Sequence, residues 1–284
     1  MRFPTVLILG VALAAGSAAR AGYMHTVLAD GPAAYWRLGE SPGATTATDQ
    51  TGTAHGTYVN SPTLGEPGLV LWDPDTAMRV AGGSASSGER VDVPNGTLGF
   101  SDRSTYSIEL LAQADGLLSR AQSMVQQRDG GARGRTLMFV KDGEDEFSSY
   151  VGGGQRLSGI AVEPGEVYHV VVVFDEAADG TAGNGTGTVR WYVNGQAGRV
   201  HSGVTGEGST GDLIIGQHKV HDTGFLGVLD EVALYDYPLD DPDGDGDFAD
   251  SRIGLHYDAA TVPEPASLLL LGAGLAALAR RRRR

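Results

Sequence analysis

The chain has 284 residues, a formal net charge of −14, 43 glycines and no cysteine. Without cysteine it forms no disulfide, thiolate metal site or cysteine nucleophile, and its acidic surface would repel phosphate backbones, so nucleic acid is not an expected partner. The many glycines are typical of short strands joined by turns and favour an all-β domain.

Residues 1–21 have the pattern of a secretory signal peptide. Arg2 is basic, residues 6–15 are apolar, and Ala19 and Ala21 stand in A-x-A spacing. The pattern predicts export with cleavage after Ala21. The alternative, an N-terminal membrane anchor, would need a longer apolar run.

Residues 22–260 form the body of the chain, which we predict to be one domain. It shows period-two alternation or short apolar runs and no long stretch of helical period. Glycine-rich turns separate the segments at short spacing, which is typical of a sandwich or barrel. The clearest strand candidates are 88–93, 104–113, 135–141, 167–175, 188–195 and 212–217.

Two of these segments carry the clearest local patterns, a strand covered on both faces and a strand that ends in a hairpin turn. "VYHVVVVFD" (167–175) is apolar on both alternate faces, so we expect it to be covered on both sides. Its His169 is expected to be a core histidine that hydrogen-bonds the backbone. In "TVRWYVNG" the odd positions share one face, and Asn194-Gly195 supplies the positive φ angles of a tight turn.

These residues carry a family resemblance. "AYWRLGE", the segments "YHVVVVFD" and "GTVRWYVNGQ", "GDLIIGQ" and "GFLGVLDEVALYDYPLD" resemble a laminin G-like, concanavalin A-like jelly-roll domain over nearly all of residues 33–257. The resemblance implies an all-β sandwich of two antiparallel sheets with a concave face and loops at its rim. One departure is that "YSIELLAQ" lacks the tryptophan that often follows the glutamate.

Several polar residues are candidates for catalytic groups. A retaining glycosidase needs two carboxyl groups about 5 Å apart, and the nearest run, Asp142, Glu144 and Glu146, begins at an Asp-Gly turn and lacks the E-x-D-x-E order. We therefore expect no catalytic residue. His218 and His221 are expected to lie on the surface, and the pair Asp230–Glu231 to have a structural role.

The tryptophans are candidates for stacking against sugars. Trp36 and Trp191 fit the core better. Trp72 lies in a loop beside "DPDT", so it is the one tryptophan predicted to be exposed and a candidate ligand-binding residue.

The segment "DDPDGDGDFADS" is a candidate calcium site. Counted from Asp241, its alternating carboxylates surround a glycine at the sixth place, Gly246, but the twelfth place, where an EF-hand loop has a bidentate acid, is Arg252. The alternative is a solvated acidic loop. The candidate ligands are Asp241, Asp243, Asp245 and Asp247.

Residues 261–284 resemble the PEP-CTERM sorting signal. "VPEP" is followed by fourteen uncharged residues, 266–279, which would span about 21 Å as a short hydrophobic helix, against roughly 30 Å of hydrocarbon. The resemblance implies a transient membrane contact, recognition by an exosortase-like enzyme and removal of the tail; a plain C-terminal anchor is the alternative. The residues that carry it are Pro263, Glu264, Pro265, Arg280, Arg281, Arg282, Arg283 and Arg284.

Together these features predict an exported, non-catalytic binding or adhesion protein. It would be sorted to the envelope, outer surface or exopolysaccharide matrix of a Gram-negative-type bacterium, where it would bind carbohydrate or a surface partner, with calcium as its one candidate cofactor. A secreted polysaccharide hydrolase or lyase and a purely structural matrix protein are the alternatives.

Overall fold

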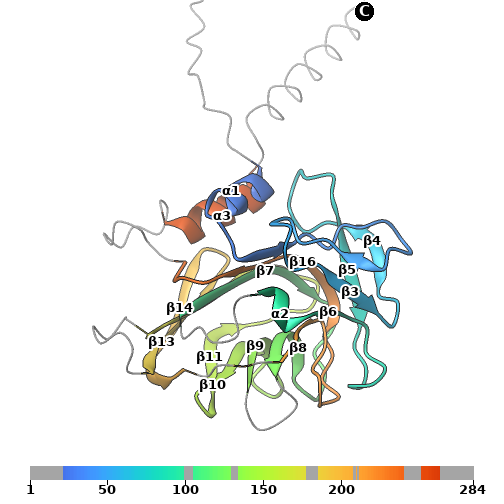
Figure 1. Cartoon of the computed structure of the whole chain (residues 1–284). Helices are drawn as coiled ribbons and strands as arrows, with labels where there is room; N and C mark the ends of the chain where they lie inside the picture. The colour runs from blue at the N-terminus through green and yellow to red at the C-terminus, as the bar shows by residue number, and fades with distance from the viewer. Residues whose placement is uncertain are drawn as a thin grey trace, which may run out of the picture.

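The computed structural model describes residues 22–98, 105–128, 134–176, 185–206, 209, 211–239 and 251–262, with the side chains of 128 and 134–137 excluded. In this part of the chain two eight-stranded sheets pack face to face, and two helices lie against the outer side of one sheet (Figure 1). Neighbouring strands pair antiparallel throughout. The predicted all-β, two-sheet sandwich is confirmed.

Sheet A has the strand order β14-β13-β12-β7-β16-β5-β4, and β1 pairs with β16. Its strands are β1 (Ala34–Trp36), β4 (Thr63–Pro67), β5 (Thr76–Ala81), β7 (Tyr106–Ala114), β12 (Val167–Asp175), β13 (Thr186–Val193), β14 (Gln196–Thr205) and β16 (Leu226–Tyr235).

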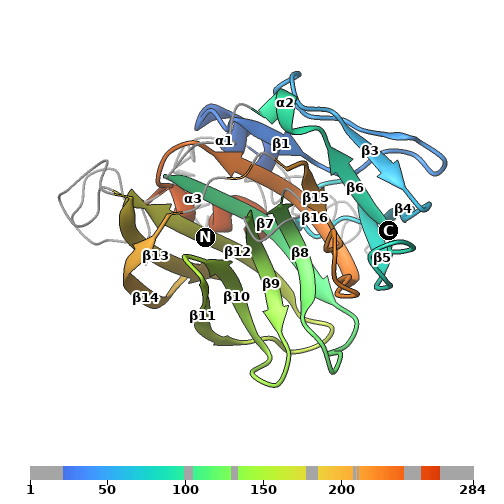
Figure 2. The ribbon, with the colours of Figure 1, turned by 60° about the horizontal axis from the view of Figure 1, so that its bottom comes forward.

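Sheet B has the strand order β11-β10-β9-β8-β15-β6-β3-β2. Its strands are β2 (Thr46–Ala47), β3 (Gly56–Val59), β6 (Arg90–Val93), β8 (Gln122–Arg128), β9 (Gly134–Lys141), β10 (Glu146–Val151), β11 (Gly154–Ala161) and β15 (Leu213–Ile215), with the short helix α2 (Asn95–Leu98) following β6. Figure 2 turns this sheet towards the viewer.

The main hydrophobic core fills the space between the sheets. Trp36 and Trp191 are both buried there, as their patterns predict, and each indole N–H donates to a backbone carbonyl. Leu110 occupies the position after the glutamate of β7, where the resemblance led us to look for tryptophan, and it is fully buried in this core. Full burial of a side chain such as Leu stabilises the fold by about 1.5–3 kcal/mol.

A second apolar cluster covers the outer side of sheet A. Leu111, Val171 and Val173 point away from the main core and pack beneath helices α1 (Tyr23–Ala29) and α3 (Arg252–Thr261). The prediction that strand 167–175 is covered on both sides is therefore confirmed. The two helices lie side by side, so the described chain begins and ends at one place (Figure 1).

The body has no long helix in its described part, as expected, but the sequence pattern does not reveal the short helices α1 and α3. In α3 the buried residues Ile253, His256 and Ala260 follow a helical spacing, but the central one is histidine, which the pattern counts as polar. Ser251 caps the helix by accepting a hydrogen bond from the Gly254 N–H. Helix α1 spans only seven residues and has no side-chain cap, so the sequence carries little signal for it.

The predicted hairpin turn is confirmed. Asn194 and Gly195 join β13 to β14 with φ angles of 49° and 70°. The Asn194 side chain also accepts a hydrogen bond from the backbone N–H of His169, which ties the turn to β12.

Candidate functional site

Residues in register with one another cross all eight strands of sheet B and define its outer face, away from the core. Ile214 marks this face, because its neighbours Leu213 and Ile215 point into the core. The cross-strand partners in register with Ile214 define the row, which we call the Gln126 row. It consists of Gln155, Tyr150, Gln126, Ile214, Asp92, Thr57 and Thr46, with the backbone of Thr136 paired between Tyr150 and Gln126.

Gln126 lies at the middle of this row, and its side-chain amide makes no hydrogen bond within the described part of the chain. The side chain is fully buried, yet neither its Oε1 nor its Nε2 has a hydrogen-bond partner in the described part of the chain. A buried polar group without a partner costs about 1–3 kcal/mol, so such groups are rare unless something else satisfies them. The Gln126 amide is therefore the strongest sign of a ligand site on this face.

The residues beside Gln126 change from buried to exposed towards both ends of the row. Ile214 is buried, while Tyr150 is 37% exposed near one end and Thr46 is exposed at the other. A parallel row places Ser123, Phe139 and Ser148 next to it, all buried. The Ser123 hydroxyl also has no described partner.

This arrangement suits hydroxyl-rich ligands. An amide presents a donor and an acceptor side by side, and a sugar hydroxyl can both donate and accept. Tyr150 supplies a partly exposed aromatic ring in the same row. Asp92 is the one carboxylate of the row, and it pairs with Arg90 at 2.7 Å. The row thus offers hydrogen bonds and an aromatic surface rather than a pair of acids.

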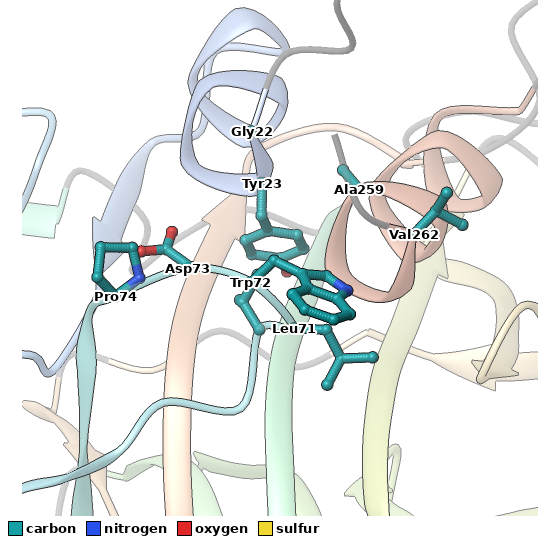
Figure 3. A pocket seen from close by; sticks show the side chains of 9 residues that line it. Gly22, Tyr23, Leu71, Trp72, Asp73, Pro74, Ala259 and Val262 are labelled. Carbon is teal, nitrogen blue, oxygen red and sulfur yellow. The ribbon is translucent and has the colours of Figure 1, made fainter. Parts of the chain in front are cut away.

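Trp72 lies elsewhere, against the outer side of sheet A near α1 and α3. It is 60% exposed, which confirms the predicted exposure, and it lines a hollow of about 270 Å³ together with Tyr23, Ala259 and Val262 (Figure 3). Its role in binding a ligand stays a prediction. The structure does not bring Trp72 together with the Gln126 row, because the two lie on opposite outer faces of the sandwich.

Other predicted site residues fall outside the described ranges. These are the candidate calcium ligands at 241, 243, 245 and 247 and the sorting residues at 263–265 and 280–284. Within the ranges that are described, no group of three or more His, Asp or Glu side chains is arranged to hold a metal ion. No helix there is long and apolar enough to span a membrane.

Two of the histidine predictions need correction. His218 is buried rather than on the surface, because its Nδ1 accepts hydrogen bonds from the backbone N–H groups of Val220 and His221. His169 is buried as expected, but its ring bonds a carboxylate: Nε2 lies 2.5 Å from Glu109 Oε1. Its Nδ1 has no described partner.

Glu109 is the centre of a buried polar cluster that sequence reasoning missed. Its carboxylate accepts hydrogen bonds from the hydroxyls of Tyr23 and Tyr235 at 3.0 and 2.8 Å and from the rings of His169 and His256. These partners come from α1, β16, β12 and α3. Glu109 is fully buried, so it joins the helices to sheet A and does not face a substrate.

The charges in this cluster stabilise each other. Burial alone would lower the pKa of His256, but the carboxylate of Glu109 and the hydrogen bond to Asp30 raise it to about 9. Both ring nitrogens of His256 face carboxylates, as a protonated imidazole requires. Burial alone would raise the pKa of Glu109, yet the positive His256 and the hydrogen bond from His169 hold it far below the usual range.

The pair Asp230–Glu231 is structural, as predicted. Glu231 accepts hydrogen bonds from Arg37 and from the Tyr35 hydroxyl, and Asp230 accepts one from the Leu69 N–H. Burial raises the pKa of Glu231 to about 7, although Arg37 opposes the shift.

The acids at 142–146 also have a structural place. Asp142 pairs with Lys141, and Glu146 accepts a hydrogen bond from the Gly159 N–H. Gly143 and Asp145 have positive φ angles of 76° and 53°, which confirms that this segment is a turn.

Comparison with known families gave two matches. Residues 85–243 match the model described as the concanavalin A-like lectin/glucanases superfamily, and residues 261–284 match the PEP-CTERM protein-sorting motif. The second match indicates export and envelope-associated sorting by an exosortase-type system. No curated protein sequence matches the chain.

Solved structures share the fold at low identity. A Trypanosoma rangeli sialidase is 14% identical with a TM-score of 0.54 over 80% of this chain, which spans about a third of the sialidase (32%). Domain 4 of AbnA, a GH43 extracellular arabinanase from Geobacillus stearothermophilus solved with arabinotriose, is 15% identical with a TM-score of 0.50, covering 81% of this chain and 98% of that one. The binding domain of botulinum neurotoxin DC in complex with rat synaptotagmin II is 9% identical with a TM-score of 0.53, over 82% and 52% of the chains.

Proposed function

The chain belongs to the concanavalin A-like lectin/glucanases superfamily, and from this premise we propose that it binds a carbohydrate on the Gln126 row without cleaving it. The observation that carries the proposal is the buried Gln126 amide with both polar atoms free. The amide is closed to solvent, so a sugar would reach it by displacing the side chains that cover it. Two neighbouring sugar hydroxyls would then satisfy its Oε1 and Nε2, and Tyr150 would pack against the sugar ring.

The sorting motif supplies the setting. An exported protein with an envelope-sorting tail meets polysaccharides at the cell surface, so the envelope or the exopolysaccharide matrix is the proposed place of binding. The same proposal includes the removal of residues 1–21 as a signal peptide. It also includes a Gram-negative-type bacterium as the source.

Hydrolysis is the second candidate, because the solved structures that share the fold include about a third of a sialidase and domain 4 of a GH43 arabinanase. The Gln126 row argues against it, since a retaining mechanism needs two carboxyl groups about 5 Å apart and the row contains only Asp92. Asp92 is moreover paired with Arg90.

The test is calorimetric titration of the protein with arabinotriose, a sialylated trisaccharide and neutral glucans. Gln126→Leu and Tyr150→Ala are expected to weaken binding of the bound glycan by about 1–3 kcal/mol, or roughly 5- to 150-fold, because each removes a group that contacts the sugar. Leu255→Ala, at an exposed position of α3 on the opposite face, serves as the control and should leave the affinity unchanged.

Three results would contradict the proposal. New reducing ends in the same mixtures would favour the hydrolase. Binding that survives Gln126→Leu would place the ligand elsewhere. Binding of none of the glycans, together with self-association that rises with calcium, would favour the structural matrix protein.

A further inference from the structure

Two exposed apolar side chains stand where the described chain ends. Leu71 and Trp72 are 54% and 60% exposed, and Val262, the last described residue, is 43% exposed. Figure 3 shows Trp72 in front of the end of α3, beside Val262. We call Leu71, Trp72 and Val262 the exit surface. Two hollows of about 270 and 280 Å³ flank it, and Leu71 lines both.

The fold holds this surface in place. The Leu71 N–H donates to the carbonyl of Ala260, 2.9 Å away, which fixes the loop to the last turn of α3. Trp72 has a φ angle of 71°, a left-handed conformation that is costly for a bulky residue. Trp72 thus combines an unusual backbone conformation with an exposed indole.

The chain length places this surface near a bilayer when the tail is inserted. Four residue steps separate Val262 from the start of the uncharged run 266–279. At no more than about 3.6 Å a step, Val262 lies within about 14 Å of that run. The polar interface on each side of a bilayer is roughly 5–8 Å thick, so the exit surface comes within its reach.

We propose that Leu71 and Trp72 lie in the interfacial layer of the lipid bilayer while the sorting tail is in the membrane. This inference rests on the proposed membrane contact of the tail. Tryptophan prefers this layer because its ring is apolar and its N–H is polar. The neighbouring Asp73 is paired with Arg37 at 2.7 Å, which lowers the cost of bringing its carboxylate near the lipid. The net charge of −14 gives no attraction to anionic headgroups, so the contact depends on the apolar side chains.

The tryptophans allow a direct measurement. The full chain is reconstituted into phosphatidylcholine–phosphatidylglycerol vesicles whose acyl chains carry bromine near the headgroups. Because Trp36 and Trp191 are buried in the core, Trp72 provides the emission that lipid can change. We expect a blue shift and quenching by the brominated lipid, both of which Trp72→Phe removes while the protein still floats with the vesicles.

A matched control places the tryptophan on the side of the molecule opposite the exit surface. Val220 is 44% exposed in the loop between β15 and β16, which lies on the opposite side of the molecule from α1 and α3 (Figure 1). The double variant Trp72→Phe with Val220→Trp should show unquenched emission. Equal quenching of both probes would mean non-specific adsorption and would overturn the inference.

The remaining outcomes separate this inference from the proposal about the tail. Flotation with no quenching of Trp72 would leave the membrane contact of the tail intact and overturn the inference. Failure to float would contradict both. A change of Trp72 emission with a soluble glycan, and none with vesicles, would overturn the lipid contact and assign Trp72 to sugar binding.

Discussion

His256 Nδ1 lies 2.9 Å from Glu109 Oε2, although 147 residues separate them in the chain. The contact joins the C-terminal helix α3 to the middle of β7, and His256 Nε2 continues it to Asp30 at the end of α1. Both helices are therefore held on sheet A by one buried chain of charges.

Glu109→Gln is expected to destabilise the fold strongly. The substitution removes the buried one of the two carboxylates that face the protonated His256 and leaves only Asp30, and breaking a buried pair in this way costs about 3–5 kcal/mol. Urea unfolding measures the loss. The control is Asp142→Asn, whose partnership with Lys141 is partly exposed and should be worth less than about 1 kcal/mol. Similar losses in both variants would contradict a special role for Glu109.

The stability of the protein should fall as the solution becomes alkaline. The pKa of His256 is about 9 in the folded state, above its usual 6.5, so its contribution is complete below pH 6.5 and is lost as the pH rises through 9. The loss is on the order of 3 kcal/mol. Urea midpoints at several pH values should show it for the wild type, whereas His256→Gln should lack it. A decline of the same size over the same pH range in the variant would assign the effect to other groups.

Gln126→Met should stabilise the ligand-free protein by about 1 kcal/mol or more. The change removes two buried polar atoms without described partners and keeps a similar volume. The neighbouring Gln127→Met is the matched control: the Gln127 amide donates to Asn95 Oδ1 at 3.0 Å, so its loss should destabilise by about 1 kcal/mol. Thermal melts of both variants measure the difference. A loss of stability in Gln126→Met would show that its amide is already satisfied.

Calcium remains a prediction from the sequence. If the carboxylates at 241–247 hold the ion, the melting temperature should rise with calcium concentration, because a ligand that binds only the folded state stabilises it. Asp243→Ala and Asp245→Ala should abolish the rise after divalent ions are removed and calcium is added back. An unchanged melt in the wild type would leave a solvated acidic loop.

Local patterns in the sequence predict the strands better than the sites. The alternation in β12 and β13 and the Asn194-Gly195 turn depend on neighbouring residues, and the structure confirms all three. Glu109 and His256 meet through pairings between distant segments, which no local pattern contains. Gln126 was missed for a related reason: register shifts at Val125 interrupt the alternation of β8, so its outward face cannot be read from the sequence.

The order of the layers sets how far a bound glycan would stand from the membrane. Helices α1 and α3, sheet A, the core and sheet B follow one another, with the chain leaving at the helices and the Gln126 row on the last outer surface. Spacings of about 10 Å between layers put that row roughly 20 Å beyond the helices. In a molecule anchored by its tail, the helices would face the membrane. The bound ligand would lie on the side of the protein farthest from the membrane, facing the surroundings of the cell.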